Sequence, residues 1–188
     1  MYVSSQINPL QTIQAVDPSL TYINEFKAGT LVYLVQRNSS LYILKMAPLY
    51  EEWGLGYTEM LKSFLQREYE VLQRIKGVEN VSQLEQVYET PNGTIALLKK
   101  YIEGTELKEG IYLSTKSQLR RTVSIMHERG ISGLDLTRGR DSGSYKNIIS
   151  SADGNKASLI DFDHCKLKEK DKDYEEKKGR DISDLSLL

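Results

Sequence analysis

The amino-acid sequence predicts an α+β protein, with strands gathered in its first half and a helix leading its second half. Two β-rich runs, an amphipathic helix and two further β-rich runs follow one another in the first half, which is the order ββαββ. The second half opens with another amphipathic helix and continues with two short strand candidates. The chain has 188 residues, of which 39% are hydrophobic and 27% charged, enough for one core or two small lobes. We therefore expect one domain over residues 1–188.

Charge and composition exclude several classes of protein. The chain has 25 basic and 26 acidic side chains, so no general positive field attracts nucleic acid or an anionic membrane. No apolar run approaches the ~20 residues of a membrane-spanning helix, and residues 1–11 lack the basic and apolar regions of a secretory signal. The single cysteine, Cys165, excludes an internal disulfide and is expected to be a small core residue. We expect no nucleic-acid partner, no membrane span and a cytoplasmic location.

The first half begins with a predicted hairpin. Residues 31–46 contain two apolar, β-rich runs on either side of a polar turn at 36–40, and Lys45 ends the second run. Residues 60–76 then place apolar side chains at helical spacing up to the stop signal Gly77. These patterns predict two strands followed by an amphipathic helix.

Two more strands and the helix of the second half follow. Residues 81–89 and 94–102 have strand patterns, and the Asn-Gly pair between them is a strong hairpin signal. Residues 113–129 then predict a second helix, ended by Gly130.

The rest of the chain predicts less regular structure. Residues 147–150 and 157–162 are short strand candidates separated by an Asp-Gly-Asn turn. Residues 166–180 form a mixed charge run, which is typical of a solvated loop or an exposed helix. Residues 181–188 turn apolar again and are expected to dock as a short helix.

Three polar residues of the second half suggest a metal-dependent reaction. Asp135 follows a helix end and a glycine-bearing connection, Asn147 opens one predicted strand, and Asp161 closes the next. A hairpin would bring the three side chains together, and hard oxygen ligands of this kind suit Mg²⁺. The alternative is a polar hairpin in which the aspartates only cap turns.

The residues around these three resemble the catalytic core of the protein-kinase family. That core reads L-H-x-x-G-I-x-H-R-D-L, followed by N-I and then by D-F-G. Six residues fall at matching spacings in its first part: Met126, His127, Gly130, Ile131, Asp135 and Leu136. The resemblance implies that Asp135 orients the acceptor hydroxyl as a base, and that Asn147 and Asp161 bind Mg²⁺ on the phosphates of ATP.

The first half resembles the same family. LYILK, ending at Lys45, is similar to the strand whose lysine binds the α and β phosphates. LQREYEVLQRI is similar to the helix whose glutamate, here Glu68, holds that lysine. LLKKYIEGTEL resembles the hinge, where backbone groups from Lys100 to Ile102 would bind adenine, and EFKAGTLVYLV keeps one glycine, Gly29, of the phosphate-covering loop.

The resemblance implies a two-lobed, protein-kinase-like fold. Residues 20–100 would form a small β-rich N-lobe, and residues 101–188 a strongly truncated helical C-lobe. Such truncation is similar to that of RIO-like and lipopolysaccharide-kinase-like atypical kinases, and of the minimal effector kinases that bacterial pathogens inject into host cells. Export by a route without a signal peptide would place the chain in the host cytosol, with a host protein as partner.

Several positions depart from the family pattern. Gly133 and Leu134 stand where the family has His and Arg, which implies activity independent of activation-loop phosphorylation. Asp163 replaces the glycine of D-F-G and is expected to face solvent, with an approach to a metal as the alternative. Residues 138–146 extend the segment before Asn147 and are expected to form a mobile surface loop. The alternative is that Arg138 and Arg140 of this segment clamp phosphate or an acidic substrate. Asp181 would take the place of the aspartate that supports the catalytic loop.

The function expected from these features is ATP- and Mg²⁺-dependent transfer of phosphate to Ser or Thr of a protein. Two alternatives stay open. One is a pseudokinase-type module that binds a protein partner, because the glycine-rich loop and the His-Arg pair are incomplete. The other is a small-molecule or lipid kinase, which would use the same residues on a different acceptor.

Overall fold

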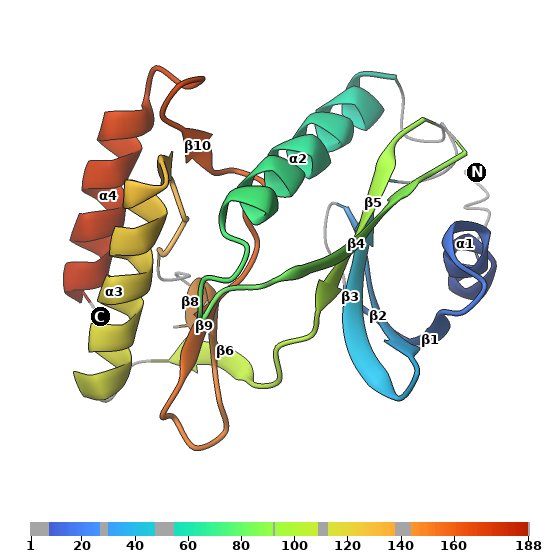
Figure 1. Cartoon of the computed structure of the whole chain (residues 1–188), viewed down its shortest axis with the longest axis horizontal. Helices are drawn as coiled ribbons and strands as arrows, with labels where there is room; N and C mark the ends of the chain where they lie inside the picture. Colours follow the sequence, from blue (N-terminus) through green and yellow to red (C-terminus); the bar gives the residue numbers. More distant parts are fainter. Residues whose placement is uncertain are drawn as a thin grey trace, which may run out of the picture. The chain divides into compact units, whose positions relative to one another are not determined.

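The computed structural model of the chain describes residues 8–26, 30–47, 55–91, 93–108, 113–137 and 144–187. These residues form the mixed α+β structure that the sequence predicts (Figure 1). The chain divides into two compact units: Met1–Leu65 with Leu84–Tyr101, and Gln66–Gln83 with Ile102–Leu188. No helix in the described part of the chain is long and apolar enough to cross a membrane.

The first unit contains a five-stranded antiparallel sheet in the order β1-β2-β3-β5-β4. Its strands are β1 (Thr21–Phe26), β2 (Leu31–Arg37), β3 (Ser40–Met46), β4 (Leu84–Glu89) and β5 (Ile95–Lys100). The two predicted strand pairs are confirmed as β2–β3 and β4–β5, whereas the sequence patterns did not predict β1.

Turn residues explain the first hairpin. Asn38 and Ser39, between β2 and β3, have φ of +50° and +63°, the backbone conformation that a two-residue hairpin turn requires. This turn pairs Arg37 with Ser40 and continues in register to Leu31 opposite Met46.

A short helix covers part of this sheet and completes its core. Helix α1 (Pro9–Val16) was not predicted, although Asn8 caps its N-terminus through Oδ1 and Pro9 occupies its first turn, which together form a helix-start signal. Ile13 of α1 is fully buried. The cluster that contains it is formed by Ile13, Leu20, Tyr33, Val35, Leu44, Met46, Ala96 and Leu98.

Helix α2 (Leu55–Arg74) is the helix predicted at residues 60–76, and it begins five residues earlier. Its buried side chains include Leu61, Leu65 and Leu72, at the helical spacing from which it was predicted. The backbone after it turns at Gly77, with φ of +78°. Residues of α2 from Gln66 onward belong to the second unit.

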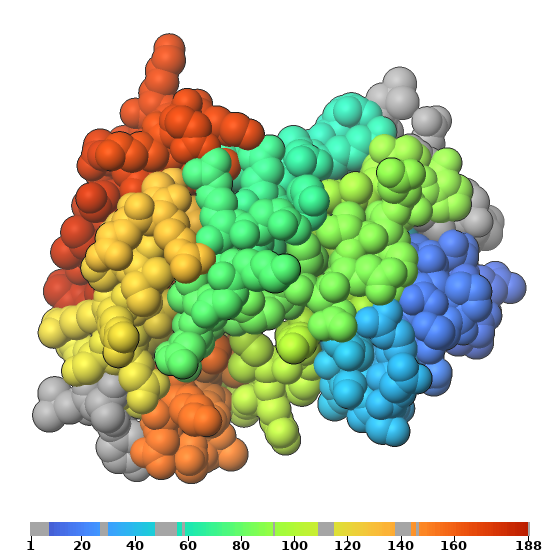
Figure 2. Space-filling model, in the orientation of Figure 1, coloured from blue at the N-terminus to red at the C-terminus, as the bar shows by residue number. Residues whose placement is uncertain are grey.

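Besides the C-terminal part of α2, the second unit contains two helices and two small sheets. Helix α3 (Leu113–Glu128) confirms the second predicted helix, and it lies beside α4 (Tyr174–Leu187) at the molecular surface (Figures 1 and 2). The three-stranded sheet has the order β6 (Thr105–Lys108), β8 (Ser144–Ser150), β9 (Ala157–Leu159). Strands β7 (Ile131–Ser132) and β10 (Lys166–Leu167) pair with each other.

Gly104 allows β6 to approach β8 closely. Its φ is +149°, and a Cβ atom at this position would collide with the backbone carbonyl of Ser150. Thr105, the next residue, pairs with Ser150 in the sheet. A residue with a side chain would therefore strain the start of β6.

The charge run at residues 166–180 is more ordered than a solvated loop. Arg67 of α2 forms a bidentate ion pair with Asp171, at 2.6 and 3.3 Å. Two further ion pairs join α2 to the run: Glu70 with Lys170 at 2.8 Å, and Arg74 with Glu169. The second half of the run forms the start of α4, whose end is the helix expected at residues 181–188.

Candidate functional site

The three polar residues selected from the sequence share an unusual backbone conformation. Asp135, Asn147 and Asp161 have φ of +47°, +60° and +60°. Only three other non-glycine residues of the described part have positive φ: Asn38, Ser39 and Asn80. Residues held in this region concentrate at turns and functional sites, and Asn and Asp tolerate it better than other residue types. The three positions therefore combine polar chemistry with a backbone that few other residues adopt.

A buried carboxylate holds the loop that leads to Asp135. Asp181 of α4 is 1% exposed. Its Oδ2 accepts a hydrogen bond from the amide of Gly133 at 2.9 Å, and its Oδ1 accepts one from the amide of Leu134 at 2.8 Å. His127 Nε2 lies 3.0 Å from Asp181 Oδ2. These partners compensate the burial of the carboxylate and fix the backbone immediately before Asp135.

Asn147 connects the loop of Asp135 to the strand before Asp161. Its Nδ2 donates to the carbonyl of Leu134 at 3.3 Å, and its own carbonyl accepts from the amide of Ile160 at 2.9 Å. Leu134 is thus held at its amide by Asp181 and at its carbonyl by Asn147. Asn147 is thus hydrogen-bonded to the residue before Asp135 and to the residue before Asp161.

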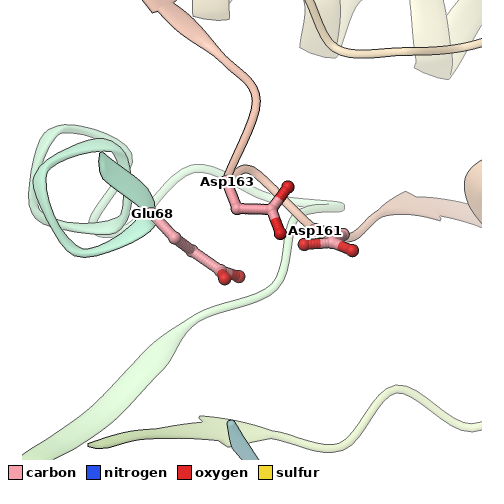
Figure 3. A group of neighbouring side chains, drawn as sticks. All are labelled: Glu68, Asp161 and Asp163. Atoms are coloured by element: carbon pink, nitrogen blue, oxygen red, sulfur yellow. The ribbon is translucent and has the colours of Figure 1, made fainter. Parts of the chain in front are cut away.

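Three carboxylates of the second unit form a candidate cation site. Glu68 of α2, Asp161 and Asp163 each offer one oxygen, and these oxygens lie within 4.8 Å of one another. Figure 3 shows the three side chains directed toward a common point, with both aspartates in the segment that follows β9. Like charges this close repel each other, and carboxylate oxygens are the ligands that Mg²⁺ prefers. This donor set therefore fits a divalent cation.

Asp163 is the member of this group for which the sequence favoured a solvent-facing role over its alternative, an approach to a metal. Its side chain was expected to face solvent, but it is only 13% exposed. Asp161 has a positive φ, and a turn follows at Asp163 and His164, where the amide of Cys165 donates to the carbonyl of Phe162 at 3.2 Å. The available signal was the Asp-Phe-Asp sequence, in which residues 161 and 163 are both acidic while Phe162 is buried.

Cys165 lies close to this concentration of negative charge. It is buried, as the sequence predicts. Burial raises the pKa of its thiol well above the usual range, and the charges of Asp181, Glu68, Asp161 and Asp163 raise it further. The thiol is therefore neutral, and the same charges favour cations in its surroundings.

Lys45, Lys100 and Ile102 are the other predicted site residues that the structure describes. Lys45 is a buried residue of β3, 2% exposed, and its backbone pairs with Val32 and Leu97. Lys100, at the end of β5, is exposed, and Ile102 is partly buried. Gly29 lies outside the described residues, and so does most of the predicted loop, residues 138–143.

Two comparisons with known proteins found no match. Neither the family models nor the curated proteins include a match to the chain. Its function is therefore inferred from its residues and their geometry.

Proposed function

We propose that the chain is an ATP- and Mg²⁺-dependent phosphotransferase with a two-lobed, protein-kinase-like fold, and that it phosphorylates Ser or Thr of a protein. The observation that carries the proposal is the fixed backbone before Asp135. Asp181 holds the amides of Gly133 and Leu134, and Asn147 holds the carbonyl of Leu134. A general base must be positioned within hydrogen-bond reach of the proton that it accepts, and this support provides such positioning.

Asp135 takes the part of the base in this proposal. Its side chain is partly exposed, and its Oδ1 accepts a hydrogen bond from Thr137 Oγ1 at 2.9 Å. Asp135 orients the acceptor hydroxyl and accepts its proton. The acceptor oxygen then bonds to the γ-phosphorus of ATP, and the bond from that phosphorus to the β–γ bridging oxygen breaks, which releases ADP.

Asp161 is the proposed principal ligand of Mg²⁺. Glu68 and Asp163 are the further carboxylates available to it in the structure, and Asn147 is the second ligand that the family resemblance implies. Bound Mg²⁺ would neutralise the negative charge that spreads over the phosphates. By the same resemblance, Lys45 binds the α and β phosphates and Glu68 orients Lys45, while backbone groups from Lys100 to Ile102 bind adenine.

Phosphate transfer tests the proposal directly. The full chain is incubated with Mg²⁺, labelled ATP and a mixture of proteins, and both autophosphorylation and substrate labelling are measured. Asp135→Asn and Asp161→Asn should each reduce labelling by about 10²-fold or more, because they remove the base and a metal ligand without forcing a new backbone conformation. The matched control Asp173→Asn changes a surface aspartate that is 38% exposed, and it should keep wild-type activity.

Nucleotide binding separates an enzyme from a module that only binds proteins. ATP with Mg²⁺ at 100 times its Kd should stabilise the folded chain by about 2.7 kcal/mol, and Asp161→Asn should weaken this effect. Labelling at the wild-type level in Asp135→Asn and in Asp161→Asn would contradict the proposal. The absence of both labelling and thermal stabilisation would also contradict the proposal, and it would favour the protein-binding module.

A further inference from the structure

A groove of the second unit lies between α3 and α4. Its volume is about 680 Å³, within the roughly 300–1,000 Å³ of sites that bind ligands. Figure 1 shows the two helices side by side and running in opposite directions. All the described residues that line the groove belong to these helices, except Lys168, which lies between β10 and α4. The groove is therefore a feature of the helix pair, and it contains none of the residues assigned to phosphate transfer.

The groove is elongated along both helices. On α3 its lining runs from Arg120 to Glu128, and on α4 it runs from Lys178 to Ser186. The lining positions on each helix are three or four residues apart, the spacing of a single helical face. Each face spans about 12 Å, at a rise of 1.5 Å per residue. A groove of this length between two helices matches about two turns of a third helix.

The middle of the groove is apolar. Val123 of α3 and Leu185 of α4 are buried, whereas the side chain of Ile182 is 56% exposed. Ile182 lies four residues after Lys178 and four before Ser186, midway along the lining of α4. Removal of this apolar surface from water is favourable. Ile182 therefore offers a contact for an apolar side chain of a partner.

Basic side chains lie toward both ends of the groove. Arg120 and Lys178 begin the linings of the two antiparallel helices, so they lie toward opposite ends. Within the part of the chain that the structure describes, Arg120, Lys168 and Lys178 form no ion pair and no side-chain hydrogen bond. Glu128 is the acidic residue of the lining, and it accepts a hydrogen bond from Ser124 Oγ at 3.4 Å. Three cations therefore face one carboxylate, which leaves the lining with a positive charge.

We propose that this groove binds an acidic amphipathic helix of a partner protein. Apolar side chains of that helix cover Ile182, while Asp and Glu residues on its flanks meet the three cations. The charge of the groove disfavours a second copy of the chain, because two such grooves facing each other would bring like charges together. This inference does not rest on the function proposed above.

Designed helical peptides test the groove. Three fluorescently labelled peptides share one amphipathic pattern: the first has Leu on the apolar face and Glu on the flanks, the second has Leu and Lys, and the third has Ser and Glu. Their dissociation constants with the full chain are measured by anisotropy. The Leu–Glu peptide should bind about tenfold more tightly than either of the others, and its affinity should fall as the salt concentration rises.

The apolar contact is tested by Ile182→Ser. This change should weaken binding of the Leu–Glu peptide by about tenfold, because it removes the exposed apolar surface of the groove. Leu187→Ser is the matched control, since Leu187 is 74% exposed on the same helix but does not line the groove. The control should keep the wild-type affinity.

The charge contact is tested by Arg120→Glu. This change should weaken binding of the Leu–Glu peptide by about threefold to tenfold and should reduce its dependence on salt. Arg121→Glu is the matched control, because Arg121 is the next residue of α3 and is exposed outside the groove. The control should keep the affinity within about twofold at physiological salt, where exposed charges are screened. The midpoint of urea unfolding, measured for every variant, shows whether each one folds.

Each contrary outcome assigns the groove differently. Equal binding of the Leu–Glu and Leu–Lys peptides, binding of none of the three, or an affinity unchanged in both Ile182→Ser and Arg120→Glu would overturn the inference. A dimer in sedimentation equilibrium that Ile182→Ser dissociates would also overturn it and would assign the groove to a second copy. None of these measurements involves ATP, so the inference and the phosphotransferase proposal can fail separately.

Discussion

Asp181 holds the backbone segment that leads to Asp135. Its carboxylate is buried and accepts from two backbone amides, with His127 beside it. The sequence indicated this aspartate only through a short resemblance, because a buried carboxylate and a surface one look alike in a helical pattern. Its importance follows from the loop that it meets, which lies nearly fifty residues earlier in the chain.

Replacing this carboxylate should cost stability as well as activity. In Asp181→Asn, the amide group can accept at one oxygen only, so one buried N–H donor loses its partner. We expect a loss of about 2–4 kcal/mol in the free energy of unfolding, measured by urea denaturation. Asp173→Asn, in an exposed pair with Lys166, should cost less than about 1 kcal/mol. Equal stability of the two variants would show that the Asp181 contacts contribute little.

Other residues differ in how far the sequence predicted them. Asp135, Asn147 and Asp161 were selected from their spacing, and Cys165 from its chemistry. For Asp163, solvent was preferred to a metal contact, because the direction of a side chain in a turn depends on backbone angles that no periodicity encodes. Lys177 was treated as part of a charge run, since only the folded helix shows that it shares a face with Asp181.

At the scale of elements, the long periodic segments were predicted, and so were β8 and β9, as the strand candidates at residues 147–150 and 157–162. Helix α1 and strands β1, β6, β7 and β10 were not predicted. Helices α2 and α3 and the strand pairs β2–β3 and β4–β5 have several repeats of their pattern. Strands β6, β7 and β10 contain two to four residues, too few for an alternation to be recognised. Such strands form because a distant partner supplies their hydrogen bonds, and that partner cannot be identified from local sequence.

The start of β6 offers a sharp test of its packing. Gly104→Ala should lower the free energy of unfolding by about 2 kcal/mol or more, because the new methyl group would meet the carbonyl of Ser150. Gly179→Ala is the matched control: it lies inside α4, and nothing lies within 4 Å of an added Cβ. This second change should stabilise the chain by about 0.5–1 kcal/mol. Thermal and urea unfolding measure both effects, and the opposite order would contradict the structure.

The ion pairs between α2 and the charge run differ in their expected contributions. The side chains of Arg67 and Asp171 are 23% and 16% exposed, whereas those of Lys170 and Glu70 are 48% and 27% exposed. Arg67→Met should therefore cost about 1–3 kcal/mol, since it leaves a largely buried Asp171 without its guanidinium. Lys170→Met should cost less than about 1 kcal/mol. Urea denaturation at low and high salt checks both values, and a larger cost for Lys170→Met would contradict this ranking.

At the scale of the whole molecule, the order of the chain does not follow the division into units. Residues Gln66–Gln83 belong with the second unit although Leu84–Tyr101 belong with the first. The amide of Ser82 donates to the carbonyl of Leu159, and the amide of Leu159 donates to the carbonyl of Asn80, each at 2.9 Å. Sequence patterns predicted the elements of both halves, but they contain no information about which later segment α2 joins.

This division predicts how fragments of the chain behave. A fragment of residues 102–188 lacks the partners of Asp171 and Leu159, so it should unfold without a cooperative transition in circular dichroism. A fragment of residues 66–188 keeps those partners and should show greater helix content and a steeper urea transition. Equal cooperativity in the two fragments would show that residues 66–83 do not contribute to the fold of the second unit.

The left-handed backbone at Asp135, Asn147 and Asp161 has a consequence for the range of substitutions that these positions tolerate. Glycine adopts such angles freely, whereas most other residues lose roughly 1–2 kcal/mol there. In a complete substitution scan read out by abundance, glycine and the Asn–Asp exchanges should therefore be the best accepted replacements at all three positions. Read out by phosphate transfer, glycine should be as damaging as any other residue. At each position, the difference between the two readouts would separate the contribution of the side chain to phosphate transfer from the contribution of the backbone conformation to folding.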